Sequence, residues 1–162
     1  MKVEIAKVHP GKPLAAPRVV KPVWCYLESR VYYVGGSGRD ETRSLYCAEA
    51  FARLVLGPMD EWAKRHGFGL LHLGCYAPRQ ARKANGQIIK PARWSTHSYG
   101  LGIDWAGIVD GRSQVIRTPA MRTACPAKLQ ELVEAVRASI AAGGRRAEIV
   151  EEPTWWHLGI WP

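Results

Sequence analysis

The sequence predicts an α+β domain in which helices cover one face of a small antiparallel sheet and leave the other face open. Two segments carry apolar residues at helical spacing, and two others alternate apolar residues with polar or small ones, as strands do. A length of 162 residues and a hydrophobic content of 47% suit one core. We therefore expect residues 1–162 to form a single domain.

The first elements are an arm and a strand. Residues 1–23 hold four of the eleven prolines together with several lysines, a composition typical of an extended or irregular lead-in. The β-branched and aromatic run 31–34 precedes the glycine-rich residues 35–38, which predicts a strand that ends in a flexible turn.

A helix and a buried strand follow. Apolar residues recur at helical spacing over 44–65, and Gly57-Pro58 should kink or divide that helix because proline cannot donate the internal hydrogen bond. The apolar run 70–75 predicts a buried strand.

The second half repeats this alternation of elements. Residues 80–94 form a basic loop that we expect to border a cleft. A second helix should begin near Pro126, which suits a first turn, and stop at Gly143-Gly144. Residues 147–150 and 155–161 are then the last strands.

His97 and Asp104 are seven residues apart, and only some backbones bring them together. A helix would place them on one face, but Gly100 and Gly102 each cost about 1 kcal/mol in a helix interior. A straight strand would point the two side chains to opposite faces. The chain must therefore turn between them, and Gly100 is the expected pivot.

After this turn the chain alternates again. In 101–105 the large apolar residues can face the core, which leaves Asp104 on the open face beside Gly102. In 155–160 the same alternation sends Trp156 to the core and places His157 with Trp155 on the other face. Two strands then present one polar side chain each on a common face.

Two imidazoles and one carboxylate are a ligand set of catalytic zinc sites, which leave a fourth position to water. A single histidine beside aromatic residues is more often a satisfied core residue than a ligand, so the joint pattern carries the prediction. Asp104 is flanked by apolar residues and would be costly to bury without a cation. We expect His97, Asp104 and His157 to hold Zn²⁺.

The pattern Ser95-x-His97-x-x-Gly100-x-x-x-Asp104, followed by Trp156-His157, resembles the M15 family of zinc peptidases. Residues 74–79 are similar to the segment that precedes the histidine motif in phage-type members, so the likeness spans roughly residues 70 to 162. Gly102 stands where the family has Ala, a change of one methyl group that should not disturb the ligands.

The resemblance implies a hedgehog or D-Ala-D-Ala peptidase-like fold, with the zinc site on the open face of the sheet. It implies hydrolysis of a peptide bond in the peptidoglycan stem peptide. The phage-like motif favours an endolysin-type L-Ala-D-Glu endopeptidase, and a D-Ala-D-Ala carboxypeptidase is the alternative with the same ligands.

The general base is the main departure from the family pattern. The family carries Glu or Asp three residues before the last His, and here that position is Thr154. Pro153 breaks the strand alternation, so a short turn can bring Glu152, or else Glu151, beneath the reacting water.

Four residues are candidates for binding substrate. Arg79 suits a carboxylate or a developing oxyanion, although it can equally belong to a solvated basic loop. Ser95 either bonds a ligand or substrate or only stabilises its loop. Tyr99 and Trp155 can wall the cleft.

A binding protein is the competing class. The net charge of +9 would attract an anionic cell envelope and nucleic acid alike. Seven tryptophans and the missing acid at Thr154 suit a non-catalytic wall-binding or nucleic-acid-binding module on the same fold. The basic residues are scattered and form no nucleic-acid reading motif, so we disfavour nucleic acid.

The N-terminal residues contain no signal-peptide pattern, and no window approaches the roughly 18 apolar residues of a membrane span. We expect cytoplasmic synthesis without membrane insertion, and action on the wall after release or virion delivery. The four cysteines show no metal-binding spacing and are expected to be free thiols, and the protein is expected to be a monomer.

Overall fold

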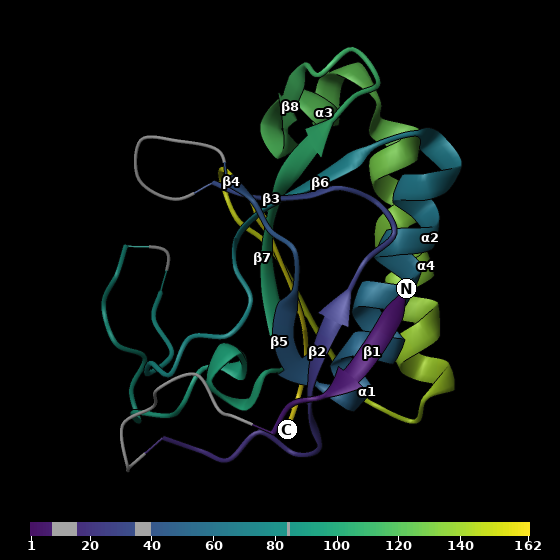
Figure 1. Ribbon diagram of the computed structural model, residues 1–162. Coiled ribbons are helices and arrows are strands. Elements are labelled where there is room, and N and C mark those ends of the chain that lie inside the picture. Colours follow the sequence, from purple (N-terminus) through teal and green to yellow (C-terminus); the bar gives the residue numbers. More distant parts are fainter. Residues whose placement is uncertain (8–15, 35–39, 84) are drawn as a thin grey trace.

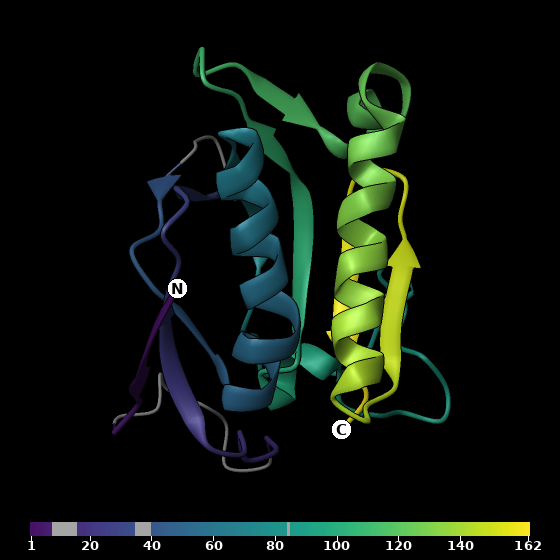
Figure 2. The same cartoon turned by 90° about the vertical axis from the view of Figure 1, so that its right-hand side faces the viewer.

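Helices α2 (Gly57–His66) and α4 (Pro126–Ala142) lie side by side on one face of a large sheet (Figure 2). The computed structural model describes residues 1–7, 16–34, 40–83 and 85–162. A shorter helix, α3 (Thr118–Ala124), leads into α4. None of the helices in the described ranges is long and apolar enough to cross a bilayer.

The large sheet has seven strands among the described residues, in the order β4-β3-β6-β7-β10-β9, with β8 also on β7 (Figure 1). Their bounds are β3 Val31–Tyr33, β4 Asp40–Glu41, β6 Gly69–Gly74, β7 Gly102–Val109, β8 Val115–Arg117, β9 Ala147–Glu151 and β10 Trp156–Ile160. Pairing is antiparallel except between β3 and β6, which are parallel. The α+β class is confirmed, but the sheet is mixed rather than purely antiparallel, because the helical connection between β3 and β6 returns the chain in the same direction.

A second sheet contains β1 (Lys2–Ile5), β2 (Pro22–Tyr26) and β5 (Leu45–Ala48). The prediction of an irregular arm over 1–23 is therefore wrong for Lys2–Ile5, which pairs along its whole length with β2. None of the prolines that suggested an arm lies in Lys2–Ile5. The first of them, Pro10, falls in residues 8–15, outside the described part of the chain. The turn predicted at 35–38 also lies outside the described residues.

The helix predicted over 44–65 begins later than expected. Leu45–Ala48 form β5, and all four residues are buried against β2, so pairing with a neighbouring strand overrides their helical spacing. The helical residues run from α1 (Glu49–Phe51) through the π-helical segment η1 (Ala52–Leu56) into α2. The predicted interruption at Gly57-Pro58 takes the form of this wider turn, in which the N–H of Gly57 donates to the carbonyl of Ala52.

The main core lies between the large sheet and the helices. Trp105, Leu158 and Ile160 from the central strands pack there with Trp62 of α2 and Leu132 of α4, and each is at most 1% exposed. Side chains alternate along β7 and β10, so residues between these core positions face the side of the sheet away from the helices. The predicted strands 70–75, 147–150 and 155–161 and the helix from Pro126 are confirmed to within two residues.

Candidate metal centre

A single 3₁₀ turn, η2 (Thr96–Tyr99), carries His97. The hydroxyl of Ser95 accepts the His97 N–H at 3.3 Å and caps the turn. Gly100 ends the turn with a φ of +67°, and a Cβ there would lie 2.8 Å from the Ala48 nitrogen. The predicted reversal at Gly100 is confirmed, and it returns the chain along β7 to Asp104.

Asp104 and His157 are direct partners in the ladder between β7 and β10. Cross-strand partners have side chains about 5 Å apart on the same face. Both side chains leave the sheet on the face opposite the helices, since their neighbours Ile103, Trp105 and Leu158 are buried in the main core. The predicted division between core and open face is therefore confirmed for both strands.

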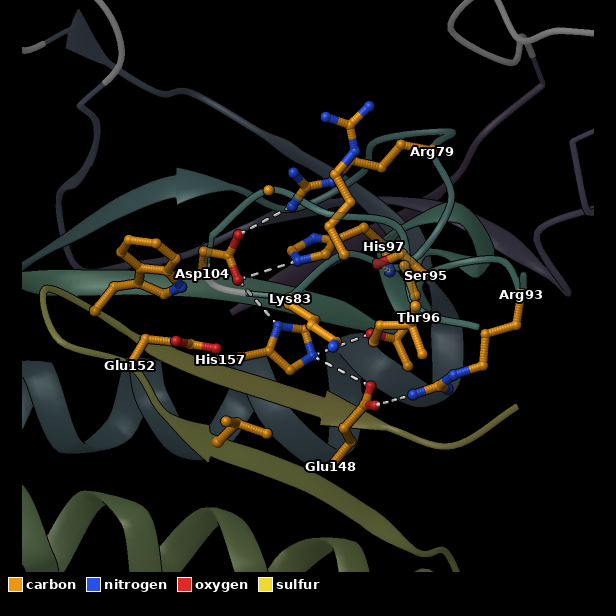
Figure 3. Close-up of a pocket in the computed structure, with 16 residues that line it drawn as sticks. Arg79, Lys83, Arg93, Ser95, Thr96, His97, Asp104, Glu148, Glu152 and His157 are labelled. Carbon is orange, nitrogen blue, oxygen red and sulfur yellow. Dashed lines mark hydrogen bonds and ion pairs between the residues drawn. The ribbon is translucent and has the colours of Figure 1, made fainter. Parts of the chain in front are cut away.

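Three atoms that can act as metal ligands converge at this point. The Nε2 of His97 lies 3.1 Å from Oδ1 of Asp104, and the Nδ1 of His157 lies 2.9 Å from the same oxygen. One donor atom from each residue lies within 4.8 Å of the others, which is a separation that one metal ion can bridge. Figure 3 shows dashed lines that join both imidazoles to the carboxylate of Asp104.

The second ring nitrogen of His97 is fixed by the backbone. Its Nδ1–H donates to the carbonyl of Cys75, which follows β6, at 2.6 Å. Nε2, the atom that faces Asp104, can therefore offer its lone pair to a metal when one binds. His97 is therefore oriented as a metal ligand requires.

The second ring nitrogen of His157 meets two oxygens on its far side. Its Nε2 lies 3.0 Å from Oγ1 of Thr96 and 3.4 Å from Oε2 of Glu148. A ring that donates Nε2–H to these oxygens presents Nδ1 to the metal position. Because Nε2 is engaged, Nδ1 is the ligand atom that the geometry selects.

The electrostatics of the site favour a bound cation. Burial would raise the pKa of Asp104, but hydrogen bonds from His157 and His97 outweigh it and hold that pKa well below its usual range. Burial lowers the pKa of His157, yet the hydrogen bonds that its ring donates to Asp104 and Glu148 raise it to about 9. Two carboxylates thus stabilise positive charge in a largely buried position, and a divalent ion can take the place of the proton.

A surface cavity opens over these donors. Its wall includes Glu152, Trp155, Ser95 and Arg79, together with residues of the basic loop 80–94 (Figure 3). The prediction that this loop borders a cleft is confirmed. Arg79 places Nη2 at 3.3 Å from Oδ2 of Asp104, while about half of its side chain stays exposed to the cavity.

Two predicted site residues lie elsewhere. Glu151 does not line the cavity, because alternation along β9 turns it toward the helix side, where it pairs with Arg122 at 2.8 Å. Tyr99 lines a different pocket, with Leu101 and Trp161, because the tight 3₁₀ turn points it away from His97. Thr154 provides no carboxyl group, and its backbone carbonyl accepts a hydrogen bond from the hydroxyl of Thr118.

Glu148 and Thr96 were missing from the predicted site. The alternation of β9 places Glu148, Val150 and Glu152 on the cavity side, so the strand predicted at 147–150 contained the necessary signal. Pairing of Glu148 with Gly159 then brings its carboxylate beside His157, but that register is not visible from spacing in the sequence.

One methyl group at Gly102 matters more than the sequence suggested. A Cβ there would lie 2.9 Å from Cε1 of His157 and 2.9 Å from Oγ1 of Thr96. The expectation that Ala and Gly are interchangeable here is wrong for this arrangement, because the ring and the hydroxyl already fill the space.

Comparisons with protein-family models, with curated proteins and with solved structures found no match to this chain.

Proposed function

We propose that this protein is a zinc-dependent peptidase that cleaves the peptidoglycan stem peptide, with L-Ala-D-Glu endopeptidase activity as the favoured reaction. The observation that carries the proposal is the convergence of His97 Nε2, Asp104 Oδ1 and His157 Nδ1 at the floor of an open cavity. The sequence likeness to M15 peptidases supplies the substrate class.

The donor set fits zinc better than Mg²⁺ or Ca²⁺. Two imidazole nitrogens and one carboxylate oxygen are typical of zinc hydrolases, whereas Mg²⁺ and Ca²⁺ prefer oxygen ligands alone. The cavity beside the donors leaves room for water and substrate. When bound, zinc would supply Lewis acidity that activates water and polarises a carbonyl at neutral pH.

Glu152 is the proposed general base. It lines the cavity, and among the described residues its carboxylate has no ion-pair or hydrogen-bond partner, so it is free to accept a proton. It would take the proton of the attacking water and return it to the leaving amine. Glu148 is the other acid of the cavity, but it lies behind His157 on the Nε2 side and suits orientation of that ring.

Arg79 is proposed to stabilise the developing oxyanion. One guanidinium nitrogen contacts Asp104, which anchors the group beside the metal position. The exposed remainder of the side chain faces the cavity, where it can donate to a substrate oxygen. Trp155 lines the same cavity and offers an apolar wall for the peptide.

Zinc content and product analysis test this proposal together. We expect about one zinc per chain in the parent by elemental analysis and little in His157→Ala. Mass spectrometry of digested muropeptides should then show a new carboxyl end on L-Ala and a new amino end on D-Glu in the parent, and no product with Glu152→Gln, which should keep its zinc. Release of terminal D-Ala would instead identify the carboxypeptidase.

A non-catalytic wall-binding module is the second candidate. Thr154 at the family's acid position favours it, because the residue provides no carboxylate. Stoichiometric zinc with binding to purified walls but no hydrolysis would support this candidate. Binding to DNA that falls steeply with salt would identify a nucleic-acid binder instead.

A further inference from the structure

The loop 80–94 forms an antiparallel ribbon, in which residues near its start pair with residues near its end, and this ribbon lies beside the metal centre. Isolated bridges join Gln80 to Trp94 and Arg82 to Ile88, and all of its residues except Ala84 are described. At its base, the N–H of Ser95 donates to the carbonyl of Arg79, and the N–H of Arg79 donates to the hydroxyl of Ser98. The ribbon is thereby fixed to the turn that carries His97.

Four cations and three carboxylates line the cavity: Arg79, Arg82, Lys83 and Arg93 against Asp104, Glu148 and Glu152. Two of the four cations are already engaged. Arg79 contacts Asp104, and Arg93 lies 3.5 Å from Glu148 while its guanidinium rests 4.5 Å from the ring of Trp161. These two serve the floor and the side wall of the site.

Arg82 and Lys83 have no ion-pair partner among the described residues, and both are exposed. The backbone of Lys83 is anchored to the other side of the loop, since the N–H of Lys83 donates to the carbonyl of Gln87 at 2.8 Å. In Figure 3 the Lys83 side chain projects over the cavity. A bound divalent ion would make the cavity still more positive.

We propose that Arg82 and Lys83 form a carboxylate-binding subsite of this cavity, so that the preferred substrate is a peptide with a free carboxylate beside the scissile bond. The guanidinium supplies a planar pair of donors and the ammonium a compact charge. This inference rests on the proposed peptidase function. In a stem peptide, the γ-linked D-glutamate has an α-carboxyl group at this position, which occurs either as the free carboxylate or as the amide.

Two synthetic stem peptides that differ only in this group test the subsite. One carries the free D-glutamate α-carboxylate and the other the carboxamide, and kcat/KM is measured for both with the zinc-loaded full chain. We expect about tenfold preference for the acid, since a charged hydrogen bond contributes roughly this much. Arg82→Gln combined with Lys83→Gln should bring the ratio close to one.

The matched control is Arg112→Gln with Arg137→Gln, which removes the same charge from exposed positions outside the cavity. It should keep the preference for the acid. Equal cleavage of both peptides by the parent, or an unchanged ratio in the Arg82 and Lys83 variant, would overturn the subsite while leaving the peptidase intact.

Failure of the peptidase itself gives a different result. If the zinc-loaded parent cleaves neither peptide, calorimetric binding of the same two peptides decides. Tighter binding of the acid, lost in the double variant, would still support the subsite. Equal binding, or a preference that the control variant also loses, would show only general attraction to a basic surface and would overturn it.

Discussion

His157 and Asp104 stand directly opposite each other in the β10–β7 ladder, with Nδ1 of the imidazole 2.9 Å from Oδ1 of the carboxylate. His97 reaches the same oxygen from a different element, the 3₁₀ turn before β7. Two of the three donors are therefore held by the sheet and the third by a capped turn. An ion bound here would tie the last strand of the chain to the centre of the sheet.

Asp104→Asn should abolish the stabilisation that zinc provides. A ligand at 100 times its Kd stabilises the native state by about 2.7 kcal/mol, which corresponds to a rise in Tm of roughly 5–10 °C for a chain of this size. The parent should show this rise when zinc is added after chelator treatment. The variant should not, because the neutral amide removes the charge that the buried ion needs.

Differential scanning calorimetry with and without zinc measures the effect. Asp110→Asn is the control, since Asp110 accepts backbone N–H groups in the β7–β8 turn, outside the cavity. A similar rise in Tm for Asp104→Asn and the parent would show that zinc binds elsewhere.

Glu148→Ala should weaken zinc binding by about 10–100-fold, the usual effect of removing a carboxylate that orients a histidine ligand. Its Oε2 lies 3.4 Å from Nε2 of His157, so among the described residues its loss leaves the Thr96 hydroxyl as the remaining partner of Nε2. Glu148→Gln should cost less, because the amide oxygen still accepts Nε2–H.

Competition with a chromophoric chelator measures these Kd values. Glu151→Ala is a matched control, since Glu151 lies on the same strand but pairs with Arg122 on the opposite face. Equal zinc affinity for Glu148→Ala and Glu151→Ala would remove Glu148 from the orienting role.

The ligand set could be predicted from the sequence because its geometry is mostly local. Two glycines between His97 and Asp104 exclude a helix, the odd spacing excludes a straight strand, and alternation decides which side chains share a face. These arguments concern single elements and place His97 and Asp104. The position of His157 opposite Asp104 depends on the pairing of β10 with β7, which spacing in the sequence does not show.

The errors come from pairing between segments. The residue types alone do not distinguish Glu148 from Glu151. Alternation along β9 and its register with β10 place Glu148 at the cavity and Glu151 beside Arg122. Leu45–Ala48 fit a helical pattern, yet their contacts with β2 make them a strand. For Leu45–Ala48 the pairing with the distant strand β2 decides the outcome, whereas for Glu148 the register with the adjacent strand β10 decides it.

Gly102→Ala should destabilise the chain and weaken zinc binding together. The added Cβ would lie 2.9 Å from His157 Cε1 and from Thr96 Oγ1, and such overpacking typically costs about 1–3 kcal/mol. The imidazole cannot move freely, since both of its nitrogens are hydrogen-bonded. We expect a lower Tm without metal and a higher Kd for zinc.

Gly111→Ala is the control for this change, because a Cβ at Gly111 would meet nothing within 4 Å. Zinc titration and thermal unfolding of both variants make the comparison. Parent-like zinc affinity for Gly102→Ala would show that the ring of His157 turns away from Gly102 without cost.

His72 should make the fold sensitive to acid. It is 4% exposed on β6, its Nε2 bonds Thr42 at 3.2 Å, and burial lowers its pKa from 6.5 to about 4. Because the native state disfavours the proton, the stability from neutral His72 is fully present above pH 6.5 and is lost as pH falls from 6.5 toward 4. A difference of this size corresponds to about 3 kcal/mol. Urea unfolding of the parent and His72→Gln at pH 7 and pH 4, both with chelator, should show the parent losing about that much more than the variant. Parallel losses would place the acid sensitivity in other groups.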